Sequence, residues 1–275
     1  MKTLILLLIA LIPTTVAAQT TVIKAGKLLD PESGTIAANQ LIVVSGRNIT
    51  AVGANLPIPA GARVIDLSGM TVMPGFMDCH THMCAGVPSR KDVPRRARGA
   101  SLGYDLGNTT AYRAIQGVAN AKTMLETGFT TIRDIGNNGN YADVDLRRAI
   151  TEGIVPGPTM ITAGRIIAPF GGQYAPADRG YTQNPERPGN GAPEYFFADT
   201  KDELRKAIHT NVYYGSQVIK IVVDDQKNIY SVDDLKFAVD ECHRAGVKLA
   251  THCVTEQGAR NAAEAGVDSI EHGFV

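Results

Sequence analysis

The sequence has no excess of charge of either sign. Its 27 lysines and arginines balance 27 aspartates and glutamates, so the formal net charge is zero. Proteins that bind nucleic acid or an anionic membrane surface usually carry a basic patch or tail, and this balanced chain gives no such indication. We therefore expect neither nucleic acid nor a membrane surface as a partner.

A hydrophobic run long enough for a stable membrane anchor is also missing near the N-terminus. The apolar run over residues 4–12 is too short to span a bilayer. A lysine precedes this run and small residues follow it, a pattern that is typical of a secretory signal peptide. We predict a signal peptide over residues 1–18 and a secreted or periplasmic protein. A buried N-terminal helix is the alternative.

Cysteine is scarce, with four residues in the chain. In an oxidising compartment four cysteines suggest disulfide bonds. However, Cys79 and Cys253 each neighbour a histidine in a predicted strand, so we expect them to point away from it into the layer between strands and helices, as small apolar side chains. Cys84 and Cys242 are less constrained, and a bridge that involves Cys84 is left open.

Histidine is scarce too, and four of the six histidines close short apolar runs. His80 and His82 end the run over residues 76–82, and they share one face because side chains alternate along a strand. His252 and His272 close two later runs in the same way. Imidazoles at the ends of strands are well placed to bind metal ions.

Lys220 lies inside the apolar run Val218 to Val223. An uncompensated ammonium group is costly to bury, so this lysine needs a special environment. The alternative is a side chain that reaches from the strand end to solvent. The remaining histidines, His209 and His243, lie in predicted helices, and we interpret them as surface or packing residues.

The distribution of turn residues divides the chain into two parts. Residues 19–72 alternate in polarity between glycine-rich turns, which predicts short strands in a small β-sandwich or sheet. From residue 73 onward, strands alternate with amphipathic helices that end at glycines, which is typical of parallel βα repeats. The predicted strands cover residues 76–82, 130–135, 159–163, 218–223, 249–254 and 269–272, and the predicted helices include 110–127, 201–214, 232–245 and 256–265.

With these residues in place, the chain resembles the amidohydrolase superfamily of metal-dependent hydrolases. The resemblance implies an α/β fold, a TIM-type (β/α)8 barrel. It also implies two divalent metal ions, for which imidazole ligands favour zinc, with manganese, iron or cobalt as alternatives. By family analogy His80 and His82 bind one ion, a carbamylated Lys220 bridges both ions, and His252 and His272 bind the second.

Residues 130–134 and 215–221 most resemble prolidase-like and imidazolonepropionase-like members of the superfamily. The implied reaction is cleavage of a C–N bond in a dipeptide, an Xaa-Pro peptide or an N-acyl amino acid by metal-bound hydroxide. Lys220, His252 and His272 are then the catalytic residues, and Tyr230 is a candidate to hold the substrate carboxylate. A cyclic amide or lactone hydrolase is the alternative. The partner is a small-molecule or dipeptide substrate, and a homo-oligomer is left open.

The family also places an aspartate at the end of the eighth barrel strand, and no residue of this chain matches it. A barrel alone takes roughly 250 residues. We therefore expect residues 73–275 to hold about six strands and to stop before strands seven and eight. A truncated, non-catalytic fragment is an alternative reading, and Asp224 does not replace the aspartate. Asp78 and Asp134 either orient a ligand or serve structural roles.

Overall fold

The computed structural model describes residues 19–85, 109–136, 139–170, 195–224 and 228–273. The chain divides into two compact units, Met1–Pro74 and Gly75–Val275. The predicted signal peptide and most of the glycine-rich stretch after Ala168 lie outside the described residues. In the described ranges, no helix combines the length and the apolar character that a membrane span requires.

The first unit is a four-stranded sheet with the strand order β3-β2-β1-β4. Strands β1 and β2 pair antiparallel, as do β2 and β3, while β4 lies parallel to β1. Gly46 has a φ of 58° in the two-residue turn between β2 and β3, which fits a type II′ hairpin turn. The described residues of the first unit therefore form a single sheet, which is one of the two predicted alternatives, a small β-sandwich or a sheet. The strands are β1 (Thr20–Leu29), β2 (Ile36–Ser45), β3 (Asn48–Gly53) and β4 (Arg63–Val72).

The second unit contains two parallel sheets, ordered β5-β6-β7 and β12-β11-β10-β8-β9. The amide of Gln217, just before β10, donates to the carbonyl oxygen of Thr162 in β7 at 2.8 Å and links the two sheets. This parallel arrangement confirms the predicted βα repeats. The strands are β5 (Phe76–Thr81), β6 (Phe129–Asp134), β7 (Thr159–Thr162), β8 (Ile166–Ala168), β9 (Tyr195–Phe197), β10 (Val218–Val222), β11 (Lys248–Cys253) and β12 (Ser269–His272).

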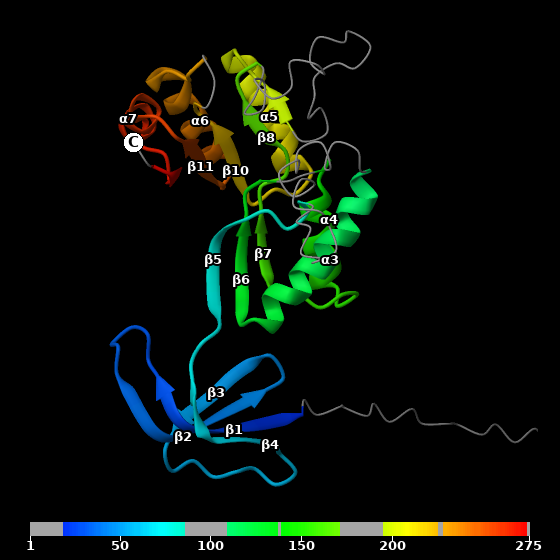
Figure 1. Ribbon diagram of the computed structural model, residues 1–275, viewed down its shortest axis with the longest axis vertical. Helices are drawn as coiled ribbons and strands as arrows, with labels where there is room; N and C mark the ends of the chain where they lie inside the picture. The colour runs from blue at the N-terminus through cyan, green and yellow to red at the C-terminus, as the bar shows by residue number, and fades with distance from the viewer. Residues whose placement is uncertain (1–18, 86–108, 137–138, 171–194, 225–227, 274–275) are drawn as a thin grey trace, which may run out of the picture. The chain divides into compact units, whose positions relative to one another are not determined.

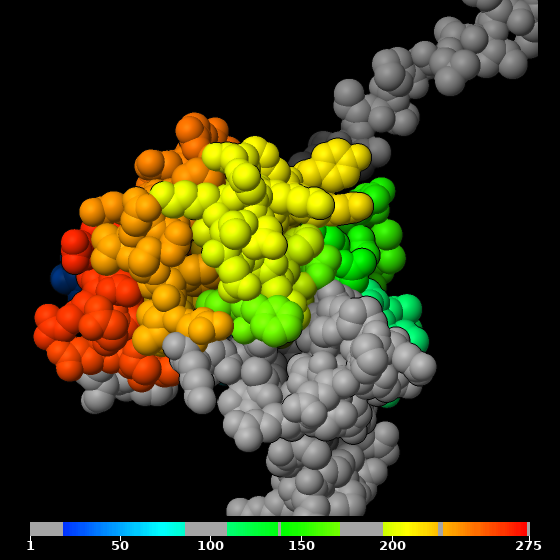
Figure 2. Space-filling view, turned by 90° about the horizontal axis from the view of Figure 1, so that it is seen from above, coloured from blue at the N-terminus to red at the C-terminus, as the bar shows by residue number. Residues whose placement is uncertain are grey.

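In the second unit, helices cover one face of each parallel sheet (Figure 1). Helices α3 (Thr110–Glu126) and α4 (Ala142–Thr151) pack on β6 and β7. Helices α5 (Lys201–Tyr213), α6 (Val232–Arg244) and α7 (Glu256–Ala265) lie side by side in the space-filling view of Figure 2. Capping boxes start α5 at Thr200 and α6 at Ser231, so local sequence fixes where these helices begin.

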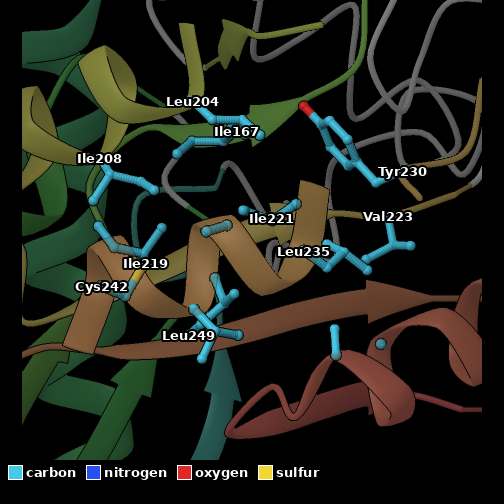
Figure 3. Close-up of a cluster of buried hydrophobic side chains, with 14 of the residues drawn as sticks. Ile167, Leu204, Ile208, Ile219, Ile221, Val223, Tyr230, Leu235, Cys242 and Leu249 are labelled. Atoms are coloured by element: carbon cyan, nitrogen blue, oxygen red, sulfur yellow. The ribbon is translucent and has the colours of Figure 1, made fainter. Parts of the chain in front are cut away.

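Alternation along β10 assigns its side chains to two different layers. Ile219, Ile221 and Val223 point into the large core that β10 shares with α5 and α6 (Figure 3). Val218 lies on the opposite face, in a small cluster with Ile135, Ala163 and Ala250. Because side chains alternate, Lys220 shares the face of Val218. The strand therefore presents its lysine away from the helices.

All four cysteines are free thiols. Cys84, Cys242 and Cys253 are buried, whereas Cys79 is exposed. The prediction that Cys79 enters the layer between strands and helices is therefore wrong. The physical reason is that, among the described residues, the helices pack on β6 and β7 and leave β5 uncovered.

Candidate metal centre

Four imidazole rings gather where strands β5, β11 and β12 end. The ring centroids of His80 and His82 are 5.2 Å apart, those of His80 and His272 are 4.9 Å apart, and those of His252 and His272 are 4.4 Å apart. Parallel strands bring their carboxyl ends to one edge, so histidines that are almost 200 positions apart become neighbours. The structure thus brings together all four histidines that the sequence singles out.

Lys220 belongs to the same cluster. It is 3% exposed, and among the described residues its Nζ atom has no hydrogen-bond partner. Burial lowers the pKa of Lys220 to about 8, although the carboxylate of Glu271 acts in the opposite direction. The alternative in which this lysine extends to solvent does not fit so buried a side chain.

His252 is 5% exposed and faces the same interior. Burial, followed by the proximity of His272 and Lys220, lowers the pKa of His252 to about 4. The imidazole is therefore neutral at physiological pH, and one of its ring nitrogens keeps a lone pair. A neutral imidazole is the form that binds a metal ion.

His272 reaches the cluster through an unusual backbone conformation. Alternation along β12 assigns Glu271 and His272 to opposite faces, yet both contact His80. The φ of His272 is 69°, in the left-handed region, where the strand ends. Such a conformation costs a non-glycine residue about 1–3 kcal/mol and clusters at functional sites. It explains how two consecutive side chains approach one histidine.

An ionic network that the sequence pattern does not predict lies behind His80. Glu271 accepts a hydrogen bond from Nδ1 of His80 at 2.9 Å and pairs through its other oxygen with Arg133 at 2.7 Å. Burial alone raises the pKa of Glu271, but hydrogen bonds from His80 and Ser269 and the charge of Arg133 outweigh it and hold the pKa at about 2. Glu271 is thus an anion. The signal in the sequence was a charged residue within the apolar run that His272 closes.

His82 has a different second partner, the backbone of Gly136. Nδ1 of His82 donates to the carbonyl oxygen of Gly136 at 3.0 Å. A Cβ atom at position 136 would lie 1.8 Å from that nitrogen, so the ring occupies space that only glycine leaves open. Since a carbonyl oxygen can only accept, the proton of the neutral ring sits on Nδ1 and the lone pair on Nε2.

The donor set and the ring spacing fit divalent metal ions. Two imidazole nitrogens that share one tetrahedral zinc ion, at about 2.0–2.1 Å each, place their ring centroids about 5 Å apart. The buried, unpartnered Nζ of Lys220 is an orphaned polar group next to these rings. Within the ranges that the structure describes, no three His, Cys, Asp or Glu side chains already lie close enough to hold an ion.

Two aspartates near the cluster accept hydrogen bonds from backbone amides. Asp78 accepts from the amide of His80 at 3.0 Å, and Asp224 accepts from the amides of Val254 and Thr255. Both carboxylates are therefore held by backbone donors, and Asp224 binds the turn just before α7, whose N-cap is Thr255.

Asp134 is fully buried and accepts from the amide of Met83, the residue after His82, at 2.6 Å. Burial, and then the neighbouring Asp143, raise its pKa well above the usual range. Its contact supports the loop that carries His82. The guanidinium of the preceding residue, Arg133, pairs with Glu271 instead.

Tyr230 does not join the cluster. It is 5% exposed and packs in the core between β10 and the helices (Figure 3), and its hydroxyl donates to the carbonyl oxygen of Ala198. Burial raises the pKa of this phenol. These contacts do not fit the expected role of Tyr230 as a substrate ligand, because packing and a backbone hydrogen bond already engage the side chain.

Comparisons with known proteins agree with this architecture. The amidohydrolase family model matches residues 71–275. The ochratoxinase of Aspergillus niger is 29% identical over 284 residues, which cover 95% of this chain and 56% of that protein. The chain thus spans about half the length of this curated relative.

Solved structures give the same picture. A prolidase in complex with N-methylphosphonate-L-proline is 29% identical with a TM-score of 0.79, over 94% of this chain and 62% of that one. A Xaa-Pro dipeptidase with methionine in its active site is 27% identical with a TM-score of 0.74, over 93% of this chain and 62% of that one. The predicted α/β barrel fold is confirmed, with prolidase-like neighbours. The chain belongs to the amidohydrolase family.

Proposed function

We propose that the whole protein is a metal-dependent hydrolase that cleaves the C–N bond of a dipeptide, an Xaa-Pro peptide or an N-acyl amino acid. One observation carries this proposal: four imidazoles and a buried lysine amine meet at the carboxyl ends of parallel strands. In barrel enzymes this end of the sheet holds the active site. The similarity to proteins named prolidase, Xaa-Pro dipeptidase and ochratoxinase supports the choice of bond.

The ligands divide into two groups in this proposal. His80 and His82 would hold one divalent ion through Nε2, since Nδ1 of each ring is engaged by an acceptor. His252 and His272 would hold a second ion, with Lys220 close to His252 as a further ligand. Such ions, with zinc favoured, would supply polarisation of a substrate carbonyl and a bound water of lowered pKa.

Lys220 becomes an anionic bridge by reaction with carbon dioxide. The neutral amine nitrogen forms a bond to the carbon of carbon dioxide and releases one proton, which leaves a carbamate. Burial without a hydrogen-bond partner favours this reaction, because the ammonium form is poorly solvated there. The carbamate replaces a costly cation with two oxygen ligands.

The first residues of the chain support a proposal about location. A charged start, a short apolar run and small residues at positions 14–18 favour export to the periplasm or the medium.

The test is a substrate panel with the whole protein, stripped of metal with a chelator and then reloaded with zinc, manganese or cobalt. Xaa-Pro dipeptides and N-acyl amino acids should be hydrolysed only after reloading. Turnover of cyclic amides or lactones alone would favour the alternative hydrolase. Absence of metal binding by the stripped protein would refute the proposal outright.

A further inference from the structure

Three strands are tied together behind His80 by the partly buried Arg133 and the buried Glu271. From β6, Arg133 donates through Nε to the carbonyl oxygen of Cys79 in β5 at 2.7 Å. Its Nη2 atom donates to Oε1 of Glu271 in β12 at 2.7 Å and to Oγ of Ser269 at 3.3 Å. Oε2 of Glu271 accepts a hydrogen bond from Nδ1 of His80.

The burial of these groups makes the geometry specific. The Glu271 side chain is 8% exposed, and its oxygens accept from Arg133, Ser269 and His80. A carboxylate held on this many sides has little rotational freedom. The guanidinium is equally fixed, because one edge is engaged by the backbone of β5 and the other by β12.

The contact decides which nitrogen of His80 carries the proton. A neutral imidazole has one N–H and one lone pair, and only the lone pair binds a metal ion. An ionised carboxylate beside Nδ1 keeps the proton on that nitrogen and leaves the lone pair on Nε2, on the side of His82 and His272. Without the carboxylate both tautomers become accessible and the ring is free to turn.

We propose that Glu271, held in place by Arg133, is the positioning residue that fixes the ring orientation and the tautomer of His80. The inference rests on the proposed function, because it takes His80 as a metal ligand. Glu271 does not touch substrate in this scheme. Arg133 acts through Glu271 and through the backbone carbonyl that precedes His80.

The experiment compares the full chain with Glu271→Gln and with the matched control Glu241→Gln. Glu241 is a suitable control because it is also a buried carboxylate that accepts from one histidine, His209, and from arginines, but it lies on α6 away from the cluster. If both variants lower the unfolding temperature equally, the loss of each ionic network costs the same stability. Any further change in metal binding by Glu271→Gln then arises at the candidate metal centre.

The first readout is zinc affinity by competition with a chromophoric chelator, together with the visible spectrum of the cobalt-loaded protein. Glu271→Gln should weaken zinc binding about 10- to 100-fold and alter the cobalt spectrum, as partners of ligating histidines do. Glu241→Gln should leave both unchanged. Equal zinc affinity in Glu271→Gln and the original chain would overturn the inference while leaving the proposed function intact.

The second readout needs no metal. Imidazole nitrogen chemical shifts of the metal-free chain should show His80 protonated at Nδ1, and a mixture of tautomers in Glu271→Gln. A single unchanged tautomer in the variant contradicts the positioning role. A chain that shows the tautomer change but binds no zinc would refute the proposed function alone, so the two failures are distinguishable.

Discussion

Gly136→Ala is expected to remove His82 from its place without unfolding the protein. The added Cβ atom would lie 1.8 Å from Nδ1 and 2.0 Å from Cε1 of His82, whereas ordinary van der Waals contact begins at 3.4 Å. Gly136 does not have a positive φ, so alanine can adopt the same backbone conformation. The histidine ring is the group that must move, since it is a side chain that can rotate outward.

The displacement exceeds what a metal ligand tolerates. Functional groups must be held within about 0.5 Å of the productive geometry, and the ring must retreat well beyond that. The variant also loses the hydrogen bond to the carbonyl oxygen of residue 136, which contributes about 0.5–1.5 kcal/mol to stability. We therefore expect metal affinity to fall at least about 10-fold, as loss of ligand orientation does, with only a modest change in the unfolding midpoint.

The assay is metal content after dialysis against a weak chelator, measured by mass spectrometry beside thermal unfolding. Gly69→Ala is the matched control, because the same methyl group would meet no heavy atom within 4 Å there. Both variants should unfold at similar temperatures, and only Gly136→Ala should lose metal. Full metal content in Gly136→Ala would show that His82 does not bind the ion from the position described.

The other predictions concern the remaining ligands and the acid stability of the fold. His80→Ala and His252→Ala should each lower metal content and activity of the whole protein together, and unchanged metal content in both would refute the ligand assignment. Lys220→Ala should lose activity, and a short carboxylic acid should restore part of it by replacing the carbamate, whereas full activity without rescue would make the lysine structural. Burial acts to raise the pKa of Asp268, but hydrogen bonds from a lysine, a backbone amide and a histidine prevail and lower it to about 2 from 3.8. A lowered pKa stabilises the fold above pH 3.8, and this contribution of about 2 kcal/mol is lost as the pH falls through 2. Asp268→Asn should therefore weaken the dependence of the unfolding free energy on pH between pH 4 and pH 2, measured by urea titrations. The same dependence on pH in the variant and the original chain would contradict this.

Local sequence patterns predict most strands and helices of the second unit, but not α4, β8 and β9. The predicted helix over residues 201–214 appears as Lys201–Tyr213, and the predicted strand over 218–223 as Val218–Val222. Period and capping decide these elements, because Thr200 and Glu203 form a capping box within four residues of one another. Such features depend on neighbours in the sequence, so they are readable without the structure.

The ionic network was not readable in the same way. Arg133 and Glu271 are 138 positions apart, and their pairing depends on how β6 and β12 face each other. The left-handed conformation of His272 was also hidden, because alternation alone predicts the wrong face for its ring. For Tyr230 the position near Lys220 predicts a binding role, whereas in the structure the side chain packs in the core and its hydroxyl donates to Ala198.

The hydrogen bond from Gln217 to Thr162 joins the two parallel sheets, and each sheet carries some of the proposed metal ligands. His80 and His82 belong to the segment of the three-stranded sheet, while Lys220, His252 and His272 belong to the five-stranded sheet. Two metal ions whose ligands come from both sheets would hold the sheets together at this point. In the proposed function, amide hydrogen exchange at Gln217 should therefore slow on metal loading, because ions bound by residues of both sheets would also hold the two sheets of the barrel wall together.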